Sequence, residues 1–198
     1  MKLILASQSP RRIELMQLMQ LQFTVQIAGE TDEIYPLGLQ REEISLYLAR
    51  LKADFFLRET EIDDETVVIT ADTIVWIGDR VLGKPTDRQD AVNILKTLSD
   101  NTHQVFTGVC LTTNNKRHSF FDESKVFFRH LTDDEIHFYI DRWQPYDKAG
   151  AYGIQEWIGY VGIEKIEGSH TNVMGLPTQK LYCALRDFGA LRTIEKKI

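Results

Sequence analysis

The run VVITADTIVWI, from Val67 to Ile77, constrains this 198-residue chain more than any other stretch. β-Branched residues dominate it, and it is apolar at nearly every position except its centre. Such a run is typical of a strand that is buried rather than one that alternates between core and solvent. The chain must therefore supply other elements to cover this strand.

The pattern around this run indicates which elements provide that cover. Residues 23–27 alternate as a short strand, and apolar residues recur at helical spacing over roughly 41–58. We further expect a helix after a capping box at Thr86, a hairpin of 103–112 and 118–129, a helix after a capping box at Thr132 and Glu135, a strand at 160–167, a loop over GSHTNVMG and a helix over 176–188. Strands and helices alternate before the hairpin, which predicts an α/β fold of three layers with a mixed sheet.

Composition narrows the class of protein. No repeat or flexible linker divides the sequence, so we expect residues 1–198 to form a single domain. A formal charge of −6 argues against a broad basic face, so no stable nucleic-acid binding is expected. Cys110 and Cys183 have no zinc-ligand spacing and suit a reducing compartment. Without a signal peptide or bilayer-length apolar run, we expect a cytoplasmic protein with no membrane partner; homodimer formation stays open.

The stretch SQSPRR near the N-terminus marks the start of a helix. Ser9 is a favourable N-cap and Pro10 suits the first helical position. Arg11 and Arg12 oppose the helix dipole unless an anion lies beside them. The stretch therefore predicts a phosphate site, with a capped helix and solvated arginines as the alternative.

Asp72 is the most informative single residue, because it stands at the centre of the apolar run. A carboxylate there is costly unless it is hydrogen-bonded, paired or facing water. The alternatives to a functional site are a solvated strand end and a buried ion pair. In a regular strand Thr73 points to the opposite face.

Three further charged groups are candidates for the same site. Lys84 stands on a constrained GKP loop from which it could reach a phosphate. Lys52 lies at the edge of the apolar stripe of the 41–58 helix, where a solvated lysine is the ordinary interpretation. Glu30, Asp32 and Glu33 form an acidic cluster that either holds a divalent metal or is an exposed loop.

The stretch DKAGAYGIQ, from Asp147 to Gln155, has small residues on both sides of an aromatic one. Its glycines allow a backbone to approach a flat ligand closely. Gln155 offers both a donor and an acceptor to the edge of a nucleobase. A flexible loop is the alternative.

Taken together in this order and spacing, ASQSPRR, LARLKA (Leu48 to Ala53), ADTIV, GKP and DKAGAYGIQ resemble the Maf family of nucleotide pyrophosphatases. The resemblance runs from Leu3 to about Leu185. It implies a fold akin to that of inosine triphosphate pyrophosphatases, with the cleft between two lobes. It also implies hydrolysis of a nucleoside triphosphate to the monophosphate and pyrophosphate, dependent on a divalent cation such as Mg²⁺ or Mn²⁺.

The resemblance extends to one subgroup of that family. Members that act on dTTP and UTP carry residues that match Arg12, Thr73 and Gln155, which implies that these three set substrate specificity. The early acidic residue of the family corresponds to Glu33. Whether standard or modified pyrimidine nucleotides are the target stays open.

The resulting hypothesis assigns a role to each residue. The triphosphate is expected to bind the N-terminus of the first helix and the side chains of Ser7, Ser9, Arg11, Lys52 and Lys84. A divalent cation would bind Asp72 or Glu33, and Asp72 would accept the proton of the attacking water. The alternative function is a non-catalytic nucleotide-binding regulator of cell division.

Overall fold

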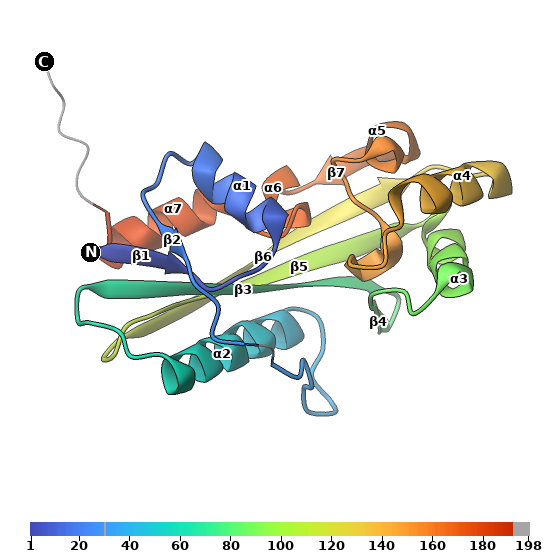
Figure 1. Ribbon diagram of the computed structural model, residues 1–198. Helices are drawn as coiled ribbons and strands as arrows, with labels where there is room; N and C mark the ends of the chain where they lie inside the picture. The colour runs from blue at the N-terminus through green and yellow to red at the C-terminus, as the bar shows by residue number, and fades with distance from the viewer. Residues whose placement is uncertain (30, 192–198) are drawn as a thin grey trace, which may run out of the picture.

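The computed structural model of the chain describes residues 1–29 and 31–191, so Glu30 of the acidic cluster lies outside the described residues. Helices flank its sheet on two sides (Figure 1). In chain order the elements are β1 (Lys2–Leu5), α1 (Pro10–Leu18), β2 (Thr24–Val25), α2 (Glu42–Glu59), β3 (Thr66–Ile77), β4 (Arg80–Leu82), α3 (Arg88–Leu98), β5 (Thr102–Thr112), β6 (Arg117–Phe128), α4 (Asp133–Trp143), the 3₁₀ turn η1 (Ala149–Ala151), α5 (Trp157–Gly162), β7 (Ile163–Glu167), α6 (His170–Val173) and α7 (Thr178–Asp187). Within these residues, no helix has both the length and the apolar character needed to cross a bilayer.

Strand β3, the predicted buried run, lies at the centre of the sheet. Among the described residues the sheet has seven strands in the order β2-β1-β3-β5-β6-β7, with β4 paired to β3. β1 is parallel to β2 and β3, whereas the other pairs are antiparallel. The predicted α/β fold of three layers with a mixed sheet is confirmed. The predicted hairpin is confirmed as β5 and β6, which meet at Thr112 and Arg117.

Helix α2 covers one face of the sheet, and α1, α6 and α7 lie on the opposite face (Figure 1). Helix α2 lies close to β5 because Gly108 of β5 has no side chain: an added Cβ would lie 2.4 Å from the backbone carbonyl of Ser45 on α2. From β3, the hydroxyl of Thr70 donates to the carbonyl oxygen of Ala49 at 2.7 Å. These contacts fix the position of α2, and with it every side chain that α2 presents to β3.

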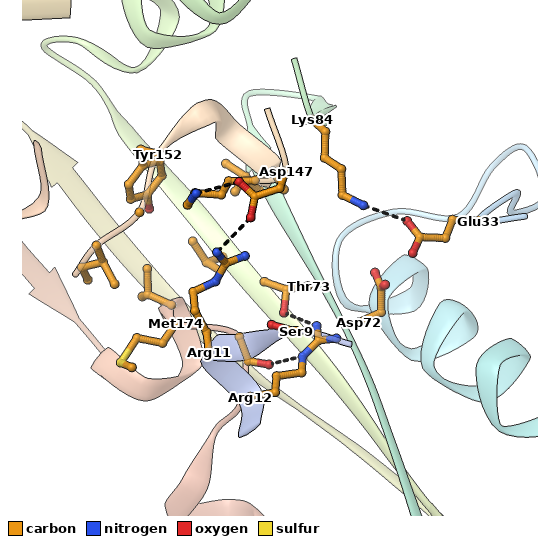
Figure 2. A pocket seen from close by; sticks show the side chains of 18 of the residues that line it. Ser9, Arg11, Arg12, Glu33, Asp72, Thr73, Lys84, Asp147, Tyr152 and Met174 are labelled. Atoms are coloured by element: carbon orange, nitrogen blue, oxygen red, sulfur yellow. Dashed lines mark hydrogen bonds and ion pairs between the residues drawn. The ribbon is translucent and has the colours of Figure 1, made fainter. Parts of the chain in front are cut away.

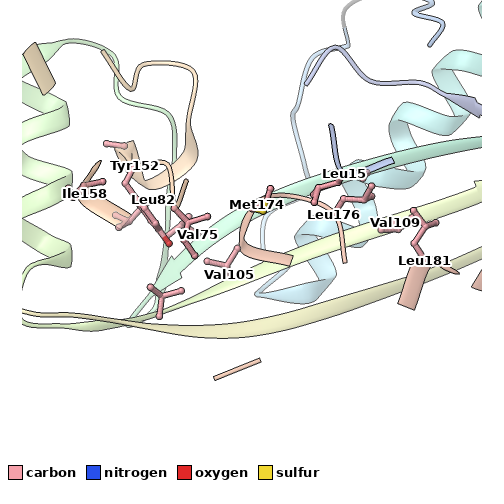
Figure 3. Close-up of a cluster of buried hydrophobic side chains, with 14 of the residues drawn as sticks. Leu15, Val75, Leu82, Val105, Val109, Tyr152, Ile158, Met174, Leu176 and Leu181 are labelled. Atoms are coloured by element: carbon pink, nitrogen blue, oxygen red, sulfur yellow. The ribbon is translucent and has the colours of Figure 1, made fainter. Parts of the chain in front are cut away.

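The larger core lies on the face opposite α2 (Figure 3). Strand residues such as Val75 and Val109 share this core with Leu15 of α1 and Leu181 of α7. Burial of apolar surface stabilises a fold by roughly 25 cal/mol per Å². Because Leu15 and its neighbour Met16 are almost completely buried, the core holds α1 in place against the sheet.

The start of α3 corrects one prediction. Its N-cap is Asp87 rather than Thr86, and the Asp87 carboxylate accepts the backbone N–H of Asp90 at 2.8 Å. The Asp90 carboxylate in turn accepts the backbone N–H of Thr86 at 2.9 Å. Two adjacent residues both have good capping chemistry, so the pattern identifies the helix start but not which of the two is the cap.

The region after α4 differs from prediction in two places. Residues 160–162 of the expected strand at 160–167 belong to helix α5, and β7 begins only at Ile163. The expected loop over GSHTNVMG contains the short helix α6, because Ser169 caps it by accepting the backbone N–H of Asn172 at 3.3 Å. The helix at Thr132 begins as predicted, with both bonds of the capping box present.

One edge of β3 is interrupted. On this edge β1 pairs with residues up to Ile69, and β4 pairs with residues from Val75 onward. In the described part of the chain no strand pairs with the edge between them, whereas β5 lines the other edge throughout this stretch. Asp72 and Thr73 lie at this gap, and their side chains point to opposite faces of the sheet. The fold thus places the most informative residue of the sequence at an opening in the sheet.

Candidate active site

A pocket lies at the gap in the edge of β3 (Figure 2). It collects most of the predicted site residues, namely Ser9, Arg11, Arg12, Glu33, Lys52, Asp72, Thr73 and Lys84. Ser7 lines the adjoining cavity, which shares Ser9 and Arg11 with the pocket. These residues come from α1, α2, β3 and three loops, so only the folded chain brings them together.

The start of α1 forms one wall of the pocket. Ser9 is the N-cap and Pro10 follows at the first helical position, as predicted. The Ser9 side chain makes no capping bond, which leaves first-turn N–H groups available to an anion. Arg11 extends across the pocket, where its Nη1 lies 3.3 Å from Oδ2 of Asp147. This wall therefore combines free backbone donors with a guanidinium group.

Lys52 connects two carboxylates on the other side of the pocket. Its Nζ lies 2.5 Å from Oδ1 of Asp72 and 2.8 Å from Oε1 of Glu33. The side chain of Asp72 is only 8% exposed and that of Lys52 20%, so their contact is largely shielded from water. The position of α2 explains the contact, because Ala49, which Thr70 anchors, lies one turn before Lys52. Asp72 is therefore a buried carboxylate held by an ammonium group.

The two carboxylates that share Lys52 differ in their pKa. Burial raises the pKa of the Asp72 carboxyl above its ordinary value, although the charges of Lys52 and Arg12 oppose this shift. Burial also acts to raise the pKa of Glu33, but Lys52 and Lys84 outweigh it and the pKa lies below its ordinary value. The environment thus favours an ionised Glu33 beside an Asp72 with increased proton affinity.

The same two carboxylates are the candidates for a metal. Among the described residues, no group of three or more His, Cys, Asp or Glu side chains could hold an ion. Mg²⁺, however, commonly uses one or two carboxylates together with water and substrate phosphates. Glu33 and Asp72 already converge on one cation, the ammonium of Lys52. The donor set therefore fits a divalent cation that shares its coordination with a phosphate chain.

Arg12 is held at the centre of a hydrogen-bonded cluster. Its Nε donates to the carbonyl oxygen of Gly175 at 2.8 Å, and its Nη2 donates to Oγ1 of Thr73 at 3.1 Å. Its Nη1 donates to the hydroxyl of Ser7 at 3.4 Å. Arg12 and Thr73, which the resemblance pairs as specificity residues, are thus in direct contact (Figure 2).

Gln155 lies apart from the other predicted residues. It lines neither cavity, and its Nε2 donates to Oε2 of Glu14 on α1 at 3.2 Å. The preceding residues of the same stretch do reach the pocket, among them Tyr152 and Ile154. A role for Gln155 in base selection stays a prediction.

Sequence reasoning missed several groups of the pocket. Asp147, which contacts Arg11, begins the DKAGAYGIQ stretch but is not among the predicted site residues. Met174 and Gly175 form part of the lining, although the sequence predicts only a loop there. Gly175 has a φ of +110° and contributes a backbone carbonyl, so the only signal in the sequence was the glycine itself.

Comparison with known proteins identifies the family of this chain. A family model described as Maf-like protein matches residues 2–188. A protein of Porphyromonas gingivalis strain W83 is 50% identical over 188 residues, which cover 95% of this chain and 94% of that protein. A protein of Parabacteroides distasonis is 52% identical, and the match covers 94% of this chain and 96% of that protein. A protein of Bacteroides fragilis strain ATCC 25285 is also 52% identical, and the match covers 93% of this chain and 95% of that protein. All three are named dTTP/UTP pyrophosphatase.

The family match and these identities extend over nearly the whole chain, including every element that contributes to the pocket. They agree with the resemblance that the ordered motifs indicated. The chain belongs to the Maf family.

Proposed function

We propose that this chain is a pyrophosphatase that hydrolyses dTTP and UTP to the monophosphate and pyrophosphate. The observation that carries the proposal is the buried Asp72, held by Lys52 in a pocket whose opposite wall is the start of α1. The names of relatives about 50% identical over most of the chain support the same substrates.

The charges of the pocket suit a triphosphate. The N-terminus of α1 and Arg11 provide donors on one side, and Lys84 provides a further ammonium on the other. In the free protein Arg11 and Lys84 are paired with Asp147 and Glu33, at 3.3 and 3.9 Å. Both pairs are partly exposed and therefore weak, so a phosphate chain can replace the carboxylates at little cost.

Asp72 is the candidate proton acceptor for the attacking water. As water attacks the α-phosphorus, a bond forms from the water oxygen and the bond to the bridging oxygen breaks, so pyrophosphate leaves. The proton of the water passes to the Asp72 carboxylate, whose raised pKa makes it a stronger base than an exposed aspartate.

We also propose that Glu33 and Asp72 hold a divalent cation, Mg²⁺ or Mn²⁺, because their oxygens converge within reach of the same pocket. When bound, such a cation neutralises charge on the phosphate oxygens and on the leaving pyrophosphate. Lys52 would then exchange its contacts with the carboxylates for contacts with the phosphates. Both cysteines are free, in keeping with the reducing, cytoplasmic compartment that we propose.

The proposal is tested by measuring pyrophosphate release from a panel of nucleoside triphosphates in the presence of Mg²⁺. Release from dTTP and UTP is expected, and Asp72→Asn should lower it by about 10² to 10⁴-fold, because the variant keeps the shape but not the base. Asp79→Asn, an exposed residue in the turn after β3, is the matched control and should be unaffected. Nucleotide binding without release would instead support the non-catalytic regulator.

A further inference from the structure

A chain of three hydrogen bonds passes through the hydroxyl of Thr73 and ends at a buried backbone carbonyl. Arg12 Nη2 donates to Thr73 Oγ1 at 3.1 Å, and that oxygen lies 2.9 Å from Oγ1 of Thr107. Thr107 is completely buried on β5 and donates to the carbonyl oxygen of Asn172 at 3.0 Å. The chain therefore connects α1, β3, β5 and α6 behind the pocket.

The direction of each bond in this chain is determined. A carbonyl oxygen only accepts, so the single hydroxyl proton of Thr107 is used on Asn172. Thr107 must then accept from Thr73, because it has no second proton. Thr73 accepts from Arg12 and donates to Thr107, which leaves its hydroxyl one lone pair and no proton. Towards the pocket, Thr73 can only accept a hydrogen bond.

Asn172, at the end of this chain of hydrogen bonds, is rigidly held. The Asn172 side chain is completely buried, and its Nδ2 donates to the carbonyl oxygen of Val105 at 3.0 Å and to Oγ of Ser124 at 2.9 Å. These bonds fasten α6 to β5 and β6. The carbonyl that orients Thr107 therefore cannot turn away without breaking buried hydrogen bonds, each of which is costly to lose.

Thr73 faces the apolar half of the pocket. Its strand neighbour on the same face, Val75, lines this half together with Val105, Tyr152, Ile154, Val173 and Met174. Asp72, Lys52 and Glu33 form a charged part of the pocket, and Arg11, Asp147 and Lys148 add further charges to its lining. A nucleoside triphosphate has one flat, uncharged end and one charged end, so its base belongs against the apolar wall, beside the hydroxyl of Thr73.

We propose that Thr107 is a positioning residue that makes Thr73 an obligatory acceptor, so that the site selects pyrimidines with an N–H at ring position 3 over cytosine. The inference rests on the proposed function, because it assigns the base to this pocket. Uracil and thymine carry that N–H, whereas cytosine has a bare nitrogen there. Within the described residues Arg12 uses three of its five N–H groups, so a donor remains beside Thr73 for the carbonyl at ring position 4 of uracil and thymine, where cytosine carries an amino group.

The first test compares kcat/KM for UTP and CTP in the wild type and three variants. Two mismatched hydrogen-bonding groups predict a wild-type preference for UTP of roughly a hundredfold. In Thr107→Val the Thr73 proton is free to turn towards a base, so the preference should fall by about tenfold. Thr107→Ser should restore it. Thr112→Val, a buried threonine elsewhere on β5, should leave it unchanged. An unchanged preference in Thr107→Val would overturn the inference.

A second test needs no variant, so it holds even if Thr107→Val fails to fold. The wild type is given 3-methyl-UTP, which lacks the N–H, and 5-methyl-UTP, which keeps it. The expected result is at least a tenfold loss of kcat/KM for the 3-methyl compound alone. Equal hydrolysis of both would refute the role of Thr73 while leaving the pyrophosphatase intact. Release from none of these nucleotides would overturn the proposed function, and the inference with it.

Discussion

Replacing Lys52 by methionine removes the ammonium that lies between Asp72 and Glu33. The Asp72 side chain is 8% exposed, so its carboxylate would stay buried without its nearest counter-charge. Breaking a buried ion pair costs about 3–5 kcal/mol in stability. The side chain of Lys52 is 20% exposed, and that of Glu33 is more exposed than that of Asp72. We therefore expect Lys52→Met to lower the free energy of unfolding by about 3 kcal/mol at neutral pH, at the lower end of that range.

The loss should depend on pH in a defined direction. Burial already raises the pKa of Asp72 above its unfolded value, and without Lys52 it should rise further. A group with a raised folded pKa binds more protons in the folded state than in the unfolded state, so its contribution to stability improves as pH falls. The difference between wild type and Lys52→Met should therefore be largest near neutral pH and shrink in acid, as Asp72 takes up a proton.

The assay is urea unfolding of both proteins from neutral to acid pH, with two controls. Lys96→Met removes an exposed lysine that pairs with Asp133, and should cost less than about 1 kcal/mol. The double variant Lys52→Met/Asp72→Asn replaces the buried Asp72 carboxylate by a neutral amide and should recover most of the lost stability. If Lys52→Met behaves like Lys96→Met, or if its loss is the same at every pH, the reasoning about the pair is wrong.

Three other changes test separate parts of the structure. Gly108→Ala should lower stability by about 1–3 kcal/mol in thermal or urea unfolding, because its Cβ would collide with the backbone of α2, whereas Gly83→Ala, where a Cβ meets nothing within 4 Å, should be nearly neutral. Gln155→Glu, which places a second carboxylate beside Glu14, should weaken hydrolysis of pyrimidine triphosphates while the fold is kept; unchanged selectivity would remove Gln155 from base recognition. Asp87→Ala should cost about 1 kcal/mol, measured by urea unfolding, through loss of the α3 cap.

Local signals in the sequence predicted much of the fold. The buried strand, the helix over 41–58, the hairpin and the capping box at Thr132 are confirmed, because each depends on a run of neighbouring residues. The boundary between α5 and β7 was missed: the stretch before Ile163 is short and apolar, and such stretches fit a helix or a strand equally well. There tertiary packing decides the outcome.

The site shows the same division between local and distant signals. Asp72 was noticeable because a carboxylate interrupts an apolar run, and the structure brings it into contact with Lys52. Groups that act through the backbone, such as the carbonyl oxygens of Gly175 and Asn172, have little signal in the sequence. Thr107 could not be identified either, since a buried threonine in a strand is ordinary until its partners are known. The sequence indicates the chemistry of each side chain, whereas the orientation of that side chain is known only from the fold.

The most direct test of the account is a crystal structure with a non-hydrolysable UTP analogue and Mg²⁺. We predict that the triphosphate lies between the start of α1 and Lys84, with its α-phosphorus within reach of a water molecule on Asp72. The base should lie against the apolar wall beside Thr73. A triphosphate bound away from both the start of α1 and Asp72 would contradict the account.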